Sequence, residues 1–214
     1  MKLFTSVLLL VTVLAIACST NSNPVTSVTE TTKARPVVYK TVSTPSTKVD
    51  KTGIRPMQKY YRPAGTISGP VRIIIDKSDF ELRVYDSKGL LAAYPVVFGL
   101  KPLEDKFMQG DRRTPEGSFK IAYSRDHQLW KKMLMLDYPT TESMIKYKLR
   151  KKNGLIPATA TVGNGIGIHG VERGNDYFID RYYNWTNGCI SLKNTHIDDL
   201  ARYAKAGTVV TIQK

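Results

Sequence analysis

The sequence predicts a mostly β domain over residues 66–214, an open sandwich or barrel with a few short helices and an inserted helical segment. Three observations support this fold class. Short apolar segments alternate with polar positions, turns containing glycine separate them, and only two segments have helical character. No internal repeat is visible in the chain.

The predicted strands are short and follow the period of a half-buried sheet. In Glu81–Tyr85 polar and apolar residues alternate, and Asp86–Gly89 supplies the turn that follows. Glu116 and Gly117 mark a second turn before an apolar segment. We expect strands at Val71–Asp76, Glu81–Tyr85, Leu91–Phe98, Ser118–Ile121, Ile166–His169, Cys189–Leu192 and Thr208–Ile212.

A helix is predicted between the last two strands. Thr195 with Asp198 three residues later resembles a capping box, with Asp in place of the usual Glu. Gly207 is a typical stop signal. The apolar face that this helix would bury consists of Ile197, Leu200, Ala201 and Ala204.

The stretch from Ser124 to Gly163 differs from the rest of the domain. Residues 140–152 have helical character and carry many cations. We interpret the whole stretch as an insertion between core strands. It could form a lid, one wall of a cleft, or a helix on the surface, and the sequence does not decide among them.

The first 17 residues read as a secretory signal. Lys2 gives a positive start, and Leu3–Ala17 is almost wholly apolar but too short to span a membrane, which takes about 20 apolar residues. Leu14–Cys18 resembles a bacterial lipobox, with Ala15 where Leu is preferred. The resemblance implies a lipid on Cys18, a membrane anchor, and a lipoprotein of the cell envelope that faces the periplasm; Ser19 favours the outer membrane. The alternative is a plain secretory peptide in which Cys18 is incidental.

Residues 18–65 are predicted to be a disordered tether rich in Ser, Thr, Pro and Lys. This segment has eight Lys or Arg residues against Glu30 and Asp50, a net charge of +6. The whole chain carries +14, so with Lys2 counted separately residues 66–214 carry +7. A basic surface facing an anionic envelope is the interpretation we favour.

Nucleic acid and metal are not expected as partners, and no cofactor is predicted. The sequence has no zinc-ligand spacing, no helix-turn-helix signature and no run of exposed aromatic residues. His127 and His196 lack partners at metal-binding spacing. The oligomeric state is not predictable from these features.

Cys189 is the candidate nucleophile. If Cys18 takes a lipid, Cys189 is an unpaired thiol in an oxidising compartment, where structural cysteines come in pairs. It follows Gly188 at a strand start, which exposes the sulfur near backbone N–H groups. A free thiol has a pKa of about 8.5, and a nearby imidazole such as His169 would accept its proton. An inert buried cysteine and a core histidine remain the alternative from these residues alone.

The two segments Gly165–Gly170 and Asn184–Leu192 resemble the active-site signature of the YkuD-type L,D-transpeptidase family. That signature is His-Gly followed some twenty residues later by Ser/Thr-x-Gly-Cys. Further similar features occur in the same order: the strand Glu81–Tyr85, the turn Arg113–Phe119 and the segment Gly207–Val210. The resemblance covers residues 70–214.

The resemblance implies a substrate and a set of roles. Cys189 would attack a tetrapeptide stem of peptidoglycan at the L-centre of diaminopimelate and expel D-Ala. The thioester would then pass to an amine or to water. His169 would be the base, with its other ring nitrogen held by the carbonyl of Gly170. The N–H groups of Gly188 and Cys189 would form the oxyanion hole, and Thr186 would orient the loop.

Two positions depart from the commonest family pattern. Asn187 replaces a histidine and Ser191 replaces an arginine that orients the substrate. Arg113 is one of several cations expected to compensate, together with Arg112, Arg173 and Lys193. Ser191, Arg113 and Trp185 are the predicted substrate contacts, although an aromatic residue at 185 could equally belong to the core. A branch with Trp-Thr-x-Gly-Cys-Ile is more similar to this chain.

Three functions therefore stay open. The first is an L,D-transpeptidase that cross-links stems or attaches an envelope protein. The second is an L,D-carboxypeptidase or hydrolase with the same nucleophile. The third is a degenerate, non-catalytic lipoprotein that binds peptidoglycan, which the lost arginine and the basic tether suggest.

Overall fold

The computed structural model describes residues 60–61 and 67–214. The predicted signal over 1–17, the lipidation at Cys18 and nearly all of the tether lie outside the described residues. Tyr60–Tyr61 form strand β1, paired with Ala92 and Ala93. β1 lies inside the segment 18–65 that we predicted to be a disordered tether.

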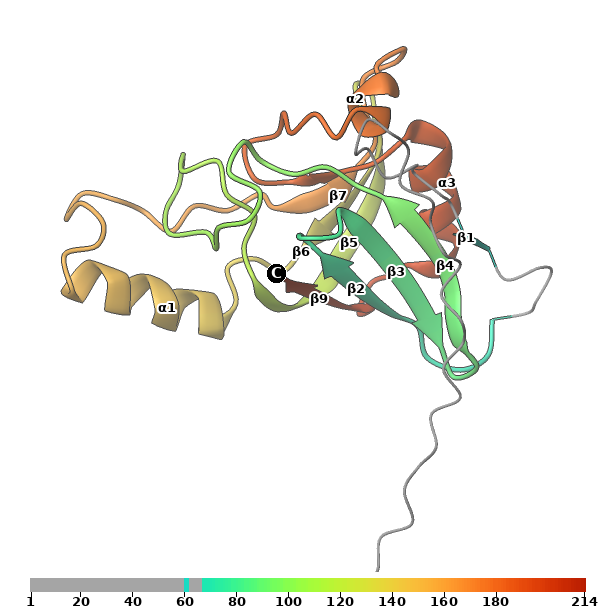
Figure 1. The fold of residues 1–214 in the computed structure, drawn as a ribbon. Helices are drawn as coiled ribbons and strands as arrows, with labels where there is room; N and C mark the ends of the chain where they lie inside the picture. The colour runs from blue at the N-terminus through green and yellow to red at the C-terminus, as the bar shows by residue number, and fades with distance from the viewer. Residues whose placement is uncertain (1–59, 62–66) are drawn as a thin grey trace, which may run out of the picture. The chain divides into compact units, whose positions relative to one another are not determined.

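The described residues form one nine-stranded sheet in the order β1-β4-β3-β2-β9-β5-β6-β7-β8 (Figure 1). The pairs β2–β9 and β7–β8 are parallel, and the other neighbours are antiparallel. The predicted mostly β fold is confirmed. The remaining strands are β2 (Arg72–Asp76), β3 (Glu81–Asp86), β4 (Gly89–Pro95), β5 (Gly117–His127), β6 (Lys131–Leu136), β7 (Gly167–His169), β8 (Ile190–Ser191) and β9 (Val209–Gln213).

The sheet curls into a half-barrel because the chain after β4 returns to β8. Val97 and Ser191 exchange two backbone hydrogen bonds, of 2.9 and 2.8 Å, and Gly99 forms a bridge with Thr186. These contacts join the second strand of the sheet order to its last one. Residues from the two ends of the sheet consequently meet around one core.

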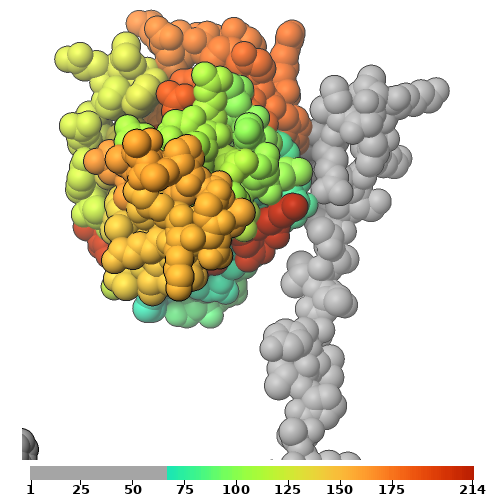
Figure 2. Space-filling model, turned by 90° about the vertical axis from the view of Figure 1, so that its left-hand side faces the viewer, coloured from blue at the N-terminus to red at the C-terminus, as the bar shows by residue number. Residues whose placement is uncertain are grey.

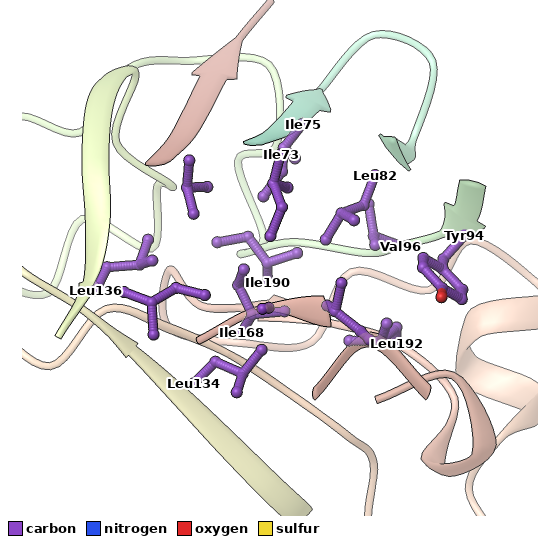
Figure 3. Close-up of a cluster of buried hydrophobic side chains, with 14 of the residues drawn as sticks. Ile73, Ile75, Leu82, Tyr94, Val96, Leu134, Leu136, Ile168, Ile190 and Leu192 are labelled. Atoms are coloured by element: carbon purple, nitrogen blue, oxygen red, sulfur yellow. The ribbon is translucent and has the colours of Figure 1, made fainter. Parts of the chain in front are cut away.

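That core consists of aliphatic and aromatic side chains that are almost completely enclosed. Ile73 and Ile75 alternate with less buried positions in β2, as the sequence pattern predicts. Figure 3 shows them facing Leu134, Ile168 and Ile190 from the other half of the sheet. Burial of these side chains fixes the register of β7 against β8, because a shift by one residue would turn Ile168 and Ile190 to the opposite face.

The helix predicted within the insertion is present as α1, Thr141–Lys152. Thr140 is its N-cap and accepts a hydrogen bond from the Ser143 N–H. Figure 2 shows α1 and the residues after it, in gold and orange, over one face of the domain. No residue of α1 is buried, and Lys146 and Arg150 bond it to the segment 105–116.

The wider insertion from Ser124 to Gly163 was predicted wrongly. β5 extends to His127 and β6 follows at Lys131–Leu136, so the first part of this stretch belongs to the sheet. Leu134 and Leu136 lie in the core. The inserted part is therefore shorter and consists of α1 with the loop that leads to β7.

The C-terminal helix α3, Asn194–Tyr203, starts earlier than predicted. Its N-cap is Lys193, which makes no side-chain capping bond, so Thr195 lies inside the helix and the capping box is wrong. Ile197 and Leu200 are buried as expected. A short helix α2, Tyr177–Asp180, precedes β8. None of the helices in the described ranges is long and apolar enough to cross a membrane.

A buried lysine holds the segment 104–116 to the end of β2. Lys77 is 0% exposed, and its ammonium donates to the carbonyls of Glu104 and Thr114 and to the carboxylate of Glu116. All three protons of the ammonium thus have an acceptor, which is the condition for burying such a charge. The segment that it holds lies against Gly188, beside Cys189.

We expect Lys77→Ala to lower the free energy of unfolding by roughly 2–4 kcal/mol, because it leaves a carboxylate and two carbonyls without their donor. Urea denaturation followed by circular dichroism measures the change. Lys120→Ala, at an exposed position, is the control and should cost less than about 0.5 kcal/mol. Equal stability of the two variants would contradict the role assigned to Lys77.

Candidate active site

The register of β7 and β8 brings Cys189 and His169 to the same face of the sheet. His169 pairs with Ser191, and Ile168 pairs with Ile190. Cys189 immediately precedes β8, so its side chain points to the same side as that of Ser191, away from the core. Cys189 lies one strand away from His169 and two residues before the partner of His169, so their Cα atoms are roughly 8 Å apart. The sulfur and the imidazole can meet across this distance.

The backbone of Gly165–Gly167 contacts the sulfur of Cys189. The Cys189 Sγ–H donates to the carbonyl of Gly165 at 3.4 Å, and the N–H of Gly167 also faces the sulfur. A Cβ at position 167 would lie 2.6 Å from Met133 Sδ and 2.9 Å from the Leu134 carbonyl oxygen. Glycine at 167 is therefore required for β6 and β7 to pack closely under the thiol.

Burial raises the pKa of the Cys189 thiol above its ordinary value. The N–H of Gly167 and the positive charge of Lys106 oppose this shift without reversing it. The resting group is therefore the neutral thiol. Nucleophilic chemistry at Cys189 requires a base that takes the proton when the substrate is bound.

His169 is 1% exposed and has the tautomer that such a base requires. Its Nδ1 lies 2.6 Å from the carbonyl oxygen of Gly170, which can only accept, so Nδ1 carries the proton. The predicted bond to Gly170 is confirmed, and Nε2 keeps its lone pair. Burial lowers the pKa of His169 to about 4, and the Gly170 bond only partly offsets this.

Thr186 organises the loop that leads to Cys189. Its hydroxyl donates to the carbonyl of Cys189 at 2.7 Å and accepts from the N–H of Gly188 at 3.1 Å. These contacts fit the predicted part of Thr186 in orienting the loop. Asn187, the departure at the histidine position, is exposed at its tip.

The N–H of Gly188, which we predicted to be an oxyanion donor, is bonded within the loop in this structure. This N–H points to Thr186, and the backbone of Gly188 at φ 131° lies so close to Arg113 that a Cβ would be 2.6 Å from the Arg113 carbonyl oxygen. The N–H of Cys189 is the member of the predicted pair on which that proposal still rests.

Ser191 was predicted to contact substrate, and the structure contradicts this. The residue is 0% exposed, and its hydroxyl donates to the Gly170 carbonyl at 3.3 Å. Gly170 thus accepts from both His169 and Ser191. The side chain of Ser191 is enclosed between β7 and the segment after β4. Its hydroxyl therefore bonds the carbonyl that also fixes His169.

Arg113 and Trp185 have well-defined partners inside the protein. The Arg113 guanidinium pairs with Glu104 and lies 4.5 Å from the ring centroid of Phe107. Trp185 packs on the small cluster of Val97, Val171 and Ile179, and its ring meets that of His169 edge to face at 5.5 Å. Direct contact of either residue with substrate stays a prediction.

Sequence reasoning missed Trp130, which lies in the turn between β5 and β6. Its ring stacks on that of His169 with a centroid distance of 4.5 Å and an interplanar angle of 26°. An aromatic residue in a polar turn is the only signal in the sequence, and it does not indicate which residue the ring covers. His127, considered above as a metal ligand, stacks on the other face of Trp130. Among the described residues no three His, Cys, Asp or Glu side chains converge to hold a metal ion.

A curled, mostly β domain with a cysteine–histidine pair on adjacent parallel strands defines the class of this protein. Residues 70–212 match the model of the YkuD family, the L,D-transpeptidase catalytic domain. The chain belongs to this family. The curated proteins include no match.

Solved structures have similar folds. The helical cell shape determining protein Pgp2 from Campylobacter jejuni is 21% identical with a TM-score of 0.51, over 74% of this chain and 50% of that one. Bd1075 from Bdellovibrio bacteriovorus is 23% identical with a TM-score of 0.48, over 68% of this chain and 48% of that one. An L,D-transpeptidase from Xylanimonas cellulosilytica DSM 15894 is 18% identical with a TM-score of 0.45, over 72% of this chain and 65% of that one. The present chain thus spans about half the length of the first two, and the likeness concerns the fold.

The buried neutral imidazole predicts a pH dependence of stability. With a pKa of about 4 when folded and about 6.5 when unfolded, His169 binds fewer protons in the folded state between these values. Its stabilising contribution is fully present above pH 6.5 and is lost as pH falls towards 4.

Urea denaturation from pH 7 to 4.5 tests this expectation against His169→Gln, whose amide can still donate to Gly170. The unsubstituted chain should lose stability more steeply, by up to about 1.4 kcal/mol per pH unit. Parallel curves for the two proteins would show that His169 does not carry the shift.

Proposed function

We propose that this chain is an exported L,D-transpeptidase that acts on tetrapeptide stems of peptidoglycan through a thioester on Cys189. The observation that carries the proposal is the register of β7 and β8, which places Cys189 on the same face as a buried imidazole whose Nδ1 is fixed by Gly170. Membership of the L,D-transpeptidase family supplies the substrate class.

In the proposed first step, Nε2 of His169 takes the proton of Cys189 as the sulfur attacks the scissile carbonyl carbon. The C–S bond forms, the carbonyl oxygen becomes an oxyanion, and we assign the N–H of Cys189 as a donor to it. The imidazolium then gives its proton to the leaving nitrogen, the C–N bond breaks, and D-Ala departs.

The second step reverses the roles. An acceptor amine loses a proton to His169 and attacks the thioester carbonyl; the C–S bond breaks and the sulfur recovers the proton. Water in place of the amine would make the same site an L,D-carboxypeptidase. The fixed tautomer suits both steps, because Nε2 must accept and donate in turn while Nδ1 stays bonded to Gly170.

The charge of the chain supports an anionic polymer as partner. The chain carries a net charge of +14, of which residues 66–214 contribute +7. Muropeptide stems carry carboxylates, which such a surface attracts. We propose that the protein works in the cell envelope as a lipoprotein anchored through Cys18, with the segment that follows as its tether to the outer membrane.

The activity is tested by incubating the full chain with disaccharide-tetrapeptide and analysing products and intact protein by mass spectrometry. We expect cross-linked dimers that lack one D-Ala, together with an adduct on Cys189 equal to the stem minus D-Ala. Cys189→Ala should remove the adduct and lower turnover at least about 10³-fold, because the nucleophile is lost, while its denaturation curve stays unchanged.

The other products discriminate among the alternatives. Tripeptide without dimers would replace the transpeptidase with an L,D-carboxypeptidase. Absence of both products and of any adduct would overturn the enzymatic proposal and leave the peptidoglycan-binding lipoprotein. Sedimentation of labelled peptidoglycan sacculi with the chain then measures that binding.

The anchor is tested separately by fractionation. We expect the chain to incorporate radiolabelled palmitate at Cys18. It should then partition with outer-membrane fractions, because each buried CH₂ of the lipid adds about 0.8 kcal/mol of membrane affinity. Cys18→Ser should lose the label. A chain that is soluble and unlabelled in both forms would favour the plain secretory peptide.

A further inference from the structure

The imidazole of His169 is enclosed by two tryptophans from different parts of the chain. The face of Trp130 covers it at 4.5 Å, and Trp185 meets it at 79° with a centroid distance of 5.5 Å. The two indoles touch each other edge to face at 6.4 Å. The ring therefore cannot rotate about its χ angles without displacing one of them.

Trp130 is fixed in place by contacts with His127 and Gly170. The main-chain N–H of Trp130 donates to Nδ1 of His127 at 3.2 Å, and the His127 ring stacks on the indole with a centroid distance of 4.4 Å and an interplanar angle of 8°. The carbonyl of Trp130 accepts the N–H of Gly170 at 3.0 Å. A Cβ on Gly170 would lie 2.7 Å from that carbonyl oxygen, so glycine is needed for the contact. Trp130 is thus bonded to the N–H of the residue whose carbonyl fixes the His169 tautomer.

The indole face has a chemical consequence for a buried base. When His169 accepts a proton, an imidazolium forms in a site that excludes water, and desolvation opposes it. The face of an indole carries the negative part of the ring quadrupole and attracts a cation within about 6 Å. Trp130 lies within that distance and presents its face.

We propose that Trp130 is a positioning residue of the proposed acyl transfer: its face orients the His169 ring and stabilises the imidazolium formed when Cys189 gives up its proton. This role rests on Cys189 and His169 being the nucleophile and base of the proposed function. The titratable neighbours of His169 are Cys189 from the β8 side and His127 beyond Trp130. Lys106 acts on Cys189.

Alkylation of Cys189 by iodoacetamide tests the role without peptidoglycan. The full chain with Cys18→Ser leaves one thiol, and the rate is followed from pH 5 to 10. Below the pKa of the thiol, alkylation requires transfer of the Cys189 proton to His169 and gives a reactive shoulder near neutral pH, and the free thiolate beside neutral imidazole gives the plateau at high pH. His169→Gln should retain only the plateau.

Trp130→Leu should lower the rate on the shoulder about two- to thirty-fold, the range expected from losing one cation–π contact, and leave the plateau unchanged. Trp130→Phe keeps an aromatic face and should recover most of the shoulder. Leu129→Ala, an exposed residue of the same turn, is the matched control and should behave as the parent chain.

Four results would overturn the proposal. They are a Trp130→Leu profile that matches the parent, a Phe variant as slow as the Leu variant, an equal loss of shoulder and plateau, and a parent chain without a shoulder. A merely structural role would give the equal loss, because a disordered site affects the thiol at every pH. The expected profiles with no product from muropeptides would instead retain the Trp130 contact and reject the proposed function.

Discussion

The pair of backbone hydrogen bonds between Val97 and Ser191 is the interaction on which the site depends. It seats β8 between β7 and the segment after β4, and this turns Ile190 into the core. Because side chains alternate along a strand, the same arrangement directs Cys189 and Ser191 to the other face, where His169 lies. The fold thus sets the geometry of the pair through main-chain contacts, and the side chains add the chemistry.

The electrostatics of the site follow from its enclosure. Burial favours the neutral form of both partners, raising the pKa of the thiol and lowering that of the imidazole. Such a pair stores no charge at rest and is poised to transfer a proton only when an electrophile is in place. The contacts of Gly170 fix the direction of that transfer by holding the proton on Nδ1.

Much of the sheet was predictable because buried and exposed positions alternate along its strands, and this pattern is visible within a few residues. β6 was missed since Lys131 and Lys132 begin it and the preceding end of β5 is exposed, so neither shows a clear apolar period. The Cys189–His169 pair and the Gly170 contact followed from the family resemblance. Composition and spacing alone favoured an inert cysteine and a core histidine.

The remaining site residues depend on contacts between distant parts of the chain. Ser191 is enclosed by a segment almost a hundred residues earlier, and local sequence cannot show that its hydroxyl turns to Gly170. The acceptors of Lys77 lie 27 to 39 residues away, so its burial was equally hidden. Trp130 reads as an ordinary turn residue until β6 pairs with β7.

The central place of β9 has a consequence for the order of assembly. β9 lies between β2 and β5, and it joins the half of the sheet that leads to Val97 to the half that carries His169 and Cys189 (Figure 1). Residues 209–213 follow both halves in the chain, so the strand ladder between the halves closes only after the strands that carry His169 and Cys189 have been synthesised. The sheet around Cys189 and His169 therefore becomes continuous only when β9 is in place.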